Sequence, residues 1–292
     1  MEVQVNNVVD KKKIQPLKVQ KWLERLVFYI CLYVFGIITI YPMIWMFYSS
    51  LKSNQDIMMN TFSLPTTMHF ENYVNAWQTA KIGVYFFNSV WVTLISIIAT
   101  ILIGAIAAFI LAKFKFKLRQ LIYSSFIIGL LIPVHTVLVP LFIQMRSLRL
   151  LNSLWSLVLT YTAFGLPITV FILESFIRAF PDSIIEAAVM DGCSVARIFY
   201  GIIMPMAKPA ITTVAILNFL NHWKEFSFAL IFLTDEAKKT LPIGLYNFVG
   251  AYTRDYAQMM AALVISSIPI IIIYLVLQEH VIKGMTAGAV KG

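Results

Sequence analysis

Six long apolar stretches without Asp, Glu, Lys or Arg constrain the fold of this 292-residue sequence more than any other feature. The hydrocarbon core of a bilayer is about 30 Å thick, and a helix that rises about 1.5 Å per residue needs about 20 residues to cross it. Unpaired backbone groups cannot face lipid, so such stretches must form helices. The sequence therefore predicts an all-α polytopic membrane protein with six transmembrane helices. The predicted spans are 26–51, 82–112, 120–145, 150–173, 209–223 and 256–278.

The fifth stretch, 209–223, is too short for a bilayer by itself. Its apolar character resumes after Lys224 and Glu225 and lasts to Leu233. We count it as a span on the condition that the helix extends to Leu233.

The composition agrees with a membrane protein and excludes several other classes. Apolar residues make up 60% of the chain and charged residues 13%, against roughly 25% charged in soluble domains. The cations are scattered between apolar runs and form no patch suited to nucleic acid. Cys31 and Cys193 have no neighbours spaced for a zinc site, and no G-x-x-x-x-G-K-[ST] loop is present. We therefore expect no metal or cofactor on this chain, and any ATP and Mg²⁺ on another.

The distribution of Lys and Arg predicts the orientation. Cytoplasmic loops near membrane spans are enriched in these residues. The N-terminal tail 1–25 and the loop 113–119 are the most basic segments, whereas the loop after the fifth span, with four cations, runs against the trend. We expect both the N-terminal tail and the C-terminal tail 281–292 in the cytoplasm, flanking a membrane domain 26–280 in the cytoplasmic membrane of a prokaryote.

One predicted cytoplasmic loop, 174–208, is longer than a tight turn requires. It reads as two short helices. Pro181 with Asp182 or Ser183 suits the first start, and Ser183 with Glu186 fits an S-x-x-E capping box. Gly192 suits the position after a helix end, where φ is positive.

A second helix is expected to start at Ser194 in the same loop. Its apolar face would contain Val195, Ile198, Phe199 and Ile202, and Pro205 and Pro209 would end it. Such a helix pair could lie in lipid headgroups or fit a groove on a partner protein. The first helix is acidic, contains no Lys and has small residues at Ala187 and Ala188, which favours the groove.

The spacing within this loop resembles a known family. Glu186-Ala187-Ala188, Gly192 and Ile202-x-Met204-Pro205 are similar to the EAA loop of ABC-importer permeases, E-A-A, three residues, G, nine residues, I-x-L-P. Met204 replaces the usual Leu, and Cys193 stands where Ala is frequent. The whole chain resembles the smaller permease of the maltose-type carbohydrate branch. Further matching segments are Tyr41-Pro42, Ser50-x-Lys52, Phe70-x-Asn72-Tyr73, Asn88-Ser89, Trp223-x-Glu225-Phe226, Leu241-Pro242 and the tail Lys283–Gly292.

The resemblance implies a type I ABC-importer permease that moves a sugar inward. Its partners would be a second permease, two ATP-binding-cassette ATPase subunits that bind ATP and Mg²⁺, and an extracytoplasmic solute-binding protein. The loop would dock on the ATPase, with Glu186 pairing with a cation there and Gly192 making the bend. In the alternative, Glu186 only caps its own helix through Ser183. The implied coupling residues are Glu186, Ala187, Ala188, Asp191, Gly192, Ile202 and Pro205.

The C-terminal tail has a second implied role. In the family such a tail reaches between the ATPase subunits, and its small residues make this segment flexible enough to do so. The alternative is a frayed terminus. The residues concerned are Lys283, Gly284, Thr286 and Gly288.

The fifth span carries Asn218, Asn221, His222 and Glu225 at i, i+3, i+4 and i+7, which predicts one polar helix face. Polar groups in a span tend to line a cavity or bond to another helix. This face is the candidate translocation pathway. Interhelical hydrogen bonding without solute contact is the alternative.

The external segment 235–256 is rich in aromatic residues. The resemblance implies that Tyr246, Phe248 and Tyr252 contact the solute-binding protein. An aromatic belt at the membrane interface is the alternative and accounts well for Tyr256.

Two other functions remain open from the residues alone. An ion-coupled secondary transporter would need a buried carboxylate, for which Glu225 is the one candidate. An ABC permease for another polar solute is also compatible. We expect no catalytic residue, because no H-E-x-x-H, G-x-S-x-G or carboxylate pair lies in the spans.

Overall fold

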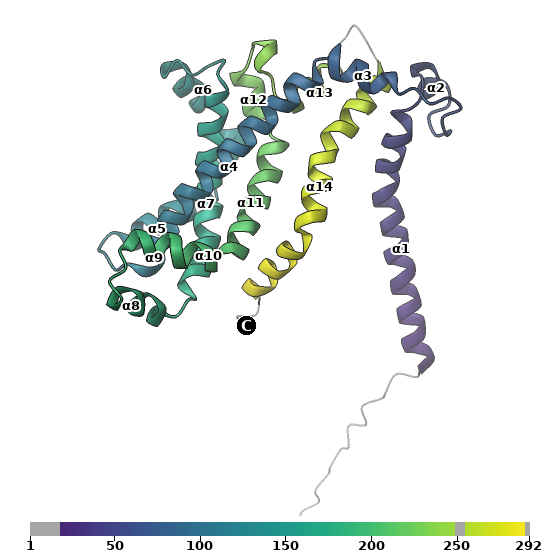
Figure 1. Ribbon diagram of the computed structural model, residues 1–292. Helices are drawn as coiled ribbons and strands as arrows, with labels where there is room; N and C mark the ends of the chain where they lie inside the picture. Colours follow the sequence, from purple (N-terminus) through teal and green to yellow (C-terminus); the bar gives the residue numbers. More distant parts are fainter. Residues whose placement is uncertain (1–17, 249–254, 290–292) are drawn as a thin grey trace, which may run out of the picture.

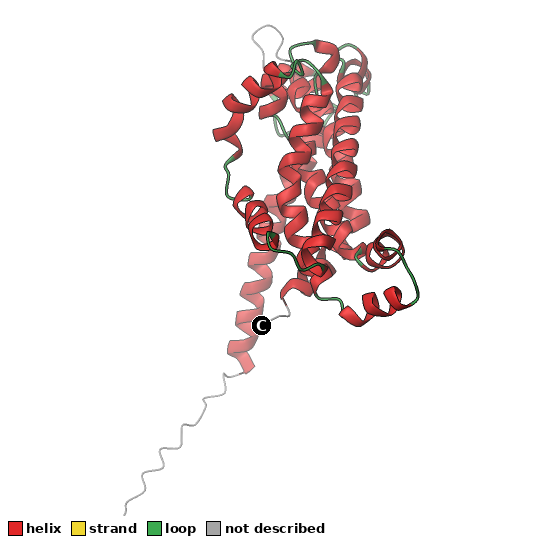
Figure 2. Ribbon diagram, turned by 90° about the vertical axis from the view of Figure 1, so that its left-hand side faces the viewer, coloured by secondary structure: helices red, strands yellow, loops and turns green. Residues whose placement is uncertain are grey.

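The computed structural model describes residues 18–248 and 255–289, and within them it contains helices, turns and loops but no strand (Figures 1 and 2). In this described part of the chain four helices are long and apolar enough to cross a membrane: α1 (Lys18–Ser49), α4 (Ile82–Lys113), α7 (Leu154–Arg178) and α14 (Tyr256–Ala289). Two bent helix pairs bring the possible number of spans to six. The all-α membrane fold predicted from the apolar stretches is confirmed.

The third predicted span is not one straight helix. It consists of α5 (Arg119–Gly129), a break, and the stretch η1 (Val134–Val137) with α6 (Leu138–Ser147), and the two halves are bent by 98°. The break includes Pro133, which has no N–H for a helical hydrogen bond and restricts the residue before it. The stretch 120–145, predicted as the third span, is therefore present as a bent helix pair.

The fifth span also ends earlier than predicted. α11 (Lys208–Trp223) stops before Lys224, and α12 (Ser227–Phe232) is a separate helix. The Glu225 carboxylate accepts hydrogen bonds from the backbone N–H groups of Phe228, at 2.7 Å, and Ala229, at 3.2 Å. The expected continuation to Leu233 is wrong because this carboxylate starts a new helix there.

The centre of the bundle is formed by α4, α7 and α11. Their backbones approach closely at glycines: a Cβ on Gly104 of α4 would lie 2.6 Å from Thr169 Cγ2, and one on Gly165 of α7 would lie 2.4 Å from Asn218 Oδ1. Small residues at such crossings allow the close packing that holds membrane helices together. At the end of the bundle that carries the loop 174–208, these helices share an apolar core with that loop.

The short helices gather at the two ends of the bundle (Figure 1). α8 (Asp182–Met190), α9 (Val195–Ile198), η2 (Phe199–Ile203) and α10 (Met204–Met206) lie at one end. The first turn of α1 and the last turn of α14 lie at that same end. At the opposite end are α2 (Asn54–Met59), α3 (Glu71–Gln78), η3 (Glu236–Lys238) and α13 (Leu241–Asn247).

α1 stands at the edge of the molecule (Figure 1). None of the residues from Trp22 to Tyr48 is buried, and the helix meets the rest of the chain near its last turn, where Ser49 and Ser50 are buried.

Candidate functional site

Helix α8 starts two residues earlier than the predicted capping box requires. It begins at Asp182, with Pro181 as the N-cap residue and no side-chain cap bond. The Ser183–Glu186 box is therefore wrong, since Ser183 already lies inside the helix. The Asp182 carboxylate is instead held by a distant cation, Lys113, at 2.7 Å. A tertiary contact has replaced the local cap.

The turn after α8 agrees with the prediction made for Gly192. This residue has φ of +78°. Its N–H donates to the Val189 carbonyl at 3.0 Å, and the Cys193 N–H donates to the Ala188 carbonyl at 2.9 Å. These two bonds define a Schellman motif, which closes a helix through a left-handed residue. A Cβ here would meet no atom within 4 Å, so the requirement for glycine comes from the backbone alone.

The outer surface of α8 is open. Glu186, Ala187 and Asp191 are exposed, whereas Ala188 is buried against the bundle. Met190 is 86% exposed and Val189 57%. Sequence reasoning missed these last two residues, although they follow the E-A-A triplet directly. The helix thus presents an acidic and apolar surface that no part of the described chain covers.

The second helix of the loop is confirmed in its start and corrected in its face. The Ser194 hydroxyl accepts a hydrogen bond from the Arg197 N–H. Ile198 and Phe199 are buried as predicted, but Val195 is exposed. The next turn is a π-helix, η2, whose wider spacing buries Ile203 and leaves Ile202 half-buried.

The chain before α11 also differs from the prediction that Pro205 and Pro209 end the second helix of the loop. Pro205 lies inside α10 and is exposed, and Pro209 lies in the first turn of α11. The chain bends by 75° between Met206 and Lys208.

Lys113, the last residue of α4, fastens this loop to the bundle. Its side chain is only 5% exposed. The ammonium donates to the Phe180 carbonyl at 2.6 Å and to Asp182 Oδ1 at 2.7 Å. The hydrogen bond and the charge of Lys113 lower the pKa of Asp182 below its usual 3.8, with a smaller contribution from Lys115. The sequence marked Lys113 only as a charge that sets orientation.

A second ionic cluster lies beside this junction. The buried Glu174 of α7 pairs with Arg178 one turn later and with Arg119 of α5 at 3.6 Å. Arg119 also donates to the Leu111 carbonyl at 2.6 Å. The cluster joins α4, α5 and α7. The i, i+4 spacing of Glu174 and Arg178 was a signal that could have found half of it.

The predicted polar face of α11 divides into separate environments. Asn218 is buried and donates to Thr169 Oγ1 of α7 at 2.9 Å. His222 is buried and stacks on Tyr161, with ring centroids 5.1 Å apart. Asn221 is exposed. Glu225 lies beyond the end of the helix and accepts from the Tyr161 hydroxyl at 2.7 Å.

The opposite end of the bundle holds the predicted binding-protein loop. Tyr246 is exposed and its ring lies 5.5 Å from that of Phe226, while Phe248 is half-buried. Tyr252 lies outside the described residues. Asn88 of α4 donates to the carbonyls of Ala237 and Lys239, at 2.9 Å each. The segment before Tyr246 is therefore fixed to α4.

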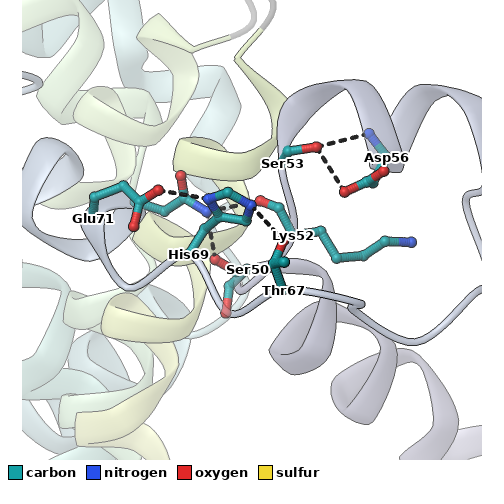
Figure 3. A network of polar contacts seen from close by, with 8 residues as sticks. Ser50, Lys52, Ser53, Asp56, Thr67, His69 and Glu71 are labelled. Carbon is teal, nitrogen blue, oxygen red and sulfur yellow. Dashed lines mark hydrogen bonds and ion pairs between the residues drawn. The ribbon is translucent and has the colours of Figure 1, made fainter.

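Hydrogen bonds hold the segment between α1 and α4 together. They are formed by residues of two of the segments that resemble the permease family, Ser50-x-Lys52 and Phe70-x-Asn72-Tyr73. Asn72 donates to the carbonyls of Ser50 and Lys52, at 2.9 Å each. The buried Lys52 donates to the carbonyls of Asn60, at 2.6 Å, and Ser63, at 2.9 Å. Figure 3 shows the neighbouring contacts of this network, including the His69–Glu71 pair at 2.5 Å. These polar residues therefore stabilise the segment between α1 and α4 by hydrogen bonds within the chain.

The C-terminal residues Lys283, Gly284, Thr286 and Gly288 lie on α14, which continues to Ala289. The backbone is helical where a flexible tail was expected, and the side chains beyond Val276 are outside the described part. Among the described residues no group of three or more His, Cys, Asp or Glu could hold a metal.

The sequence matches the family model for the binding-protein-dependent transport system inner membrane component over residues 100–287. It is 40% identical over 262 residues to the diacetylchitobiose uptake system permease protein NgcG of Streptomyces coelicolor, covering 89% of this chain and 87% of that protein. It is 37% identical over 254 residues to the sulfoquinovosyl glycerol transport system permease protein SmoH of Agrobacterium fabrum, covering 87% and 89%.

The fold is likewise found in a solved structure. A chain in the crystal structure of a bacterial ABC transporter that imports the polysaccharide alginate superimposes with a TM-score of 0.80. It shares 23% identity, and the match covers 91% of this chain and 99% of the other.

Proposed function

Because the chain belongs to the family of binding-protein-dependent transport system inner membrane components, we propose that it imports a sugar or oligosaccharide as one of two permease subunits, driven by ATP hydrolysis on separate subunits. The proposed substrate class rests on relatives whose names specify diacetylchitobiose, sulfoquinovosyl glycerol and multiple sugars. On this proposal the protein is a multi-pass subunit of the bacterial cytoplasmic membrane.

The observation that carries the proposed ATPase contact is the surface of α8. A helix whose Val189 and Met190 face outward, next to the exposed Glu186, suits a groove on another protein. Its inner residue Ala188 packs on the bundle, so a force on α8 would reach the spans. The proposed contact set combines the predicted residues with the two that the sequence missed. It comprises Glu186, Ala187, Asp191, Gly192, Val189 and Met190, with Ala188, Ile202 and Pro205 in support.

The proposed second permease would cover α1. Exposed apolar residues surround this helix on all sides, and a Cβ added to its Gly36 would meet no atom of a neighbouring element within 4 Å. Lipid can cover part of that surface. A partner permease in contact with α1 would bury the rest.

The solute pathway is proposed at Asn221, the one residue of the predicted polar face that is exposed on the helix. Asn218 and Glu225 form hydrogen bonds within the chain, which supports the alternative of interhelical bonding for these two, and the His222 ring stacks on Tyr161. Tyr246 and Phe248 are proposed to contact the solute-binding protein. The proposed cytoplasmic position of both termini and the proposed contact of the C-terminal segment with the ATPase subunits complete the assembly.

The proposal is tested with the complex reconstituted in liposomes, with its binding protein outside and ATP inside. Uptake of labelled chito-oligosaccharides and other sugars is measured with and without ATP, and again after an ionophore collapses the ion gradients. We expect uptake to require ATP and to survive the ionophore. Uptake that needs an ion gradient in place of ATP would overturn the proposed mechanism, and uptake of only a non-sugar solute would overturn the substrate class.

The coupling role of the loop is tested at Gly192. Gly192→Val places a β-branched residue at φ of +78°, so the turn should distort, whereas Gly192→Asn keeps a residue that tolerates this region. We expect the valine variant to lose most uptake while the asparagine variant retains it. Full transport by Gly192→Val would contradict the role.

A further inference from the structure

Helix α4 carries polar anchors at both of its ends. At its last residue, Lys113 holds the turn between α7 and α8. Near its first residue, Asn88 holds the carbonyls on either side of Lys238. The two anchors are 25 residues apart, which is about 38 Å along a helix.

The outer anchor consists of more than one bond. The Tyr85 hydroxyl donates to Glu236 Oε2 at 2.6 Å, and Ser89 Oγ accepts the Leu241 N–H at 2.8 Å. The Tyr85 ring also packs so closely on Gly244 that a Cβ there would lie 2.2 Å from the ring. The segment from Glu236 to Gly244 is therefore seated on the first two turns of α4.

The inner anchor is also supported by apolar packing. Ala105, Ala108 and Phe109 of α4 are buried in one cluster with Ala188 of α8. The Phe109 ring lies 5.5 Å from the Phe199 ring of η2. Because the cluster joins α4 to both short helices of the loop, the loop must move with the inner half of α4.

The body of α4 is suited to carry a movement between these ends. Of the four long helices in the described part of the chain, only α4 has no proline inside it, whereas α1 contains Pro42, α7 Pro167 and α14 Pro269. Proline removes a helical hydrogen bond and makes a kink. The two remaining candidate spans are each broken by a bend, of 98° and 75°.

We infer that α4 is the rigid element that links the external segment 236–244 to the cytoplasmic loop, with Asn88 and Lys113 as the positioning residues at its ends. The inference rests on the proposed function, since it assigns the path by which binding-protein docking outside reaches the ATPase inside. A rigid body fastened at two distant points converts movement at one into movement at the other.

The test uses the assembled complex in lipid nanodiscs and measures ATP hydrolysis with and without sugar-loaded binding protein. The readout is the stimulation ratio, the rate with the binding protein divided by the rate without it. We expect Lys113→Met and Asn88→Ala each to lower this ratio about fivefold or more, the lower end of typical allosteric couplings. Two exposed residues serve as matched controls. Lys115→Met, two residues after Lys113, and Gln78→Ala on α3 should leave the ratio unchanged.

Two further arms separate transmission from damage to the fold. Lys113→Arg keeps the charge and the donors, so it should restore most of the ratio. The double variant Lys113→Met/Asn88→Ala should be no worse than the poorer single variant, since both cut one path. Additive losses, an unchanged ratio in both single variants, or a complex without its ATPase subunits would overturn the inference. A wild-type complex without ATP-driven uptake would instead refute the proposed function.

Discussion

Helices α1 and α4 differ in their packing, although each contains 32 residues and each is apolar enough to span a membrane. In the most apolar stretch of α1 no residue is buried, whereas 39% of the corresponding stretch of α4 is buried inside the chain. Hydropathy therefore predicts that a helix crosses the membrane and says little about what it touches there. Lipid tails are as apolar as leucine, so burial in a membrane protein requires another cause.

The cause in α4 is a face of small and polar residues that repeats at spacings of three and four. Small residues on such a face let the helix backbones approach closely. The Gly104 position of α4 meets Thr169 of α7 across this face. α1 has a glycine too, but a Cβ added to Gly36 would meet no atom of a neighbouring element within 4 Å. The face consists of Ser89, Thr93, Ser96, Thr100 and Gly104, all buried.

The largest expected effect comes from filling the crossing of α4, α7 and α11. A side chain at Gly165 would begin 2.4 Å from Asn218 Oδ1 and 2.9 Å from Thr100 Cγ2, so Gly165→Leu should separate the three helices. Overpacking costs about 1–3 kcal/mol and sometimes more. We expect the folded chain to be largely lost from membranes, as measured by fluorescence-detected size-exclusion chromatography.

Gly36→Leu is the matched control on α1. The same substitution at this open position should leave the chromatographic profile of the single chain unchanged. An equal loss from both variants would break the comparison, because it would show that α1 is packed as closely as α4.

A smaller effect is expected at Asn218, whose amide joins α11 to α7. Asn218→Ala removes the bond to Thr169, and such interhelical bonds contribute about 0.6 kcal/mol on average and at most about 1.7. The midpoint of unfolding in SDS should shift accordingly. Asn221→Ala, at an exposed position, should leave this midpoint unchanged.

Measurements of uptake kinetics then distinguish the expected roles of Asn221 and Asn218. If Asn221 contacts solute, Asn221→Ala should raise the KM for uptake without loss of stability. Unchanged kinetics in that variant would remove Asn221 from the proposed pathway, and an unchanged midpoint in Asn218→Ala would remove its bond to Thr169 from the helix packing.

The parts of the loop 174–208 that the sequence predicted correctly are determined by neighbours in the chain. Gly192 and Ser194 make their bonds within a few residues, so spacing alone identifies the helix end and the next helix start. The Ser183 cap failed for the opposite reason. Lys113, 69 residues away, holds Asp182, and no local rule contains that contact.

The α11 face was harder to predict because its partners are remote. Asn218 bonds to a residue 49 positions away, and Glu225 to one 64 positions away. Helical periodicity placed both on one face, but it could not tell which partner each would meet or that the helix ends at Trp223. The small-residue spacing of α4, in contrast, was readable from the sequence and would have identified the central helix.

The smallest expected effect concerns Asp182, the exposed one of the two residues to which Lys113 donates hydrogen bonds. Its side chain is 77% exposed, and surface ion pairs contribute little, whereas the Phe180 carbonyl still accepts a hydrogen bond from Lys113. Asp182→Asn should therefore lower the stimulation ratio less than about twofold. Ser183→Ala, which removes no cap, should lower it not at all.

The pH dependence of this small effect follows from the direction of the pKa shift. Lys113 lowers the pKa of Asp182 below its usual 3.8. The contribution of the carboxylate is therefore fully present above that value and is lost only as the pH falls through the still lower folded value. Wild type and Asp182→Asn should differ by the same factor at pH 6 and pH 8. A factor that changes over this range would mean that another group near Lys113 titrates, and α4 would then be fastened to the loop by a contact that depends on pH.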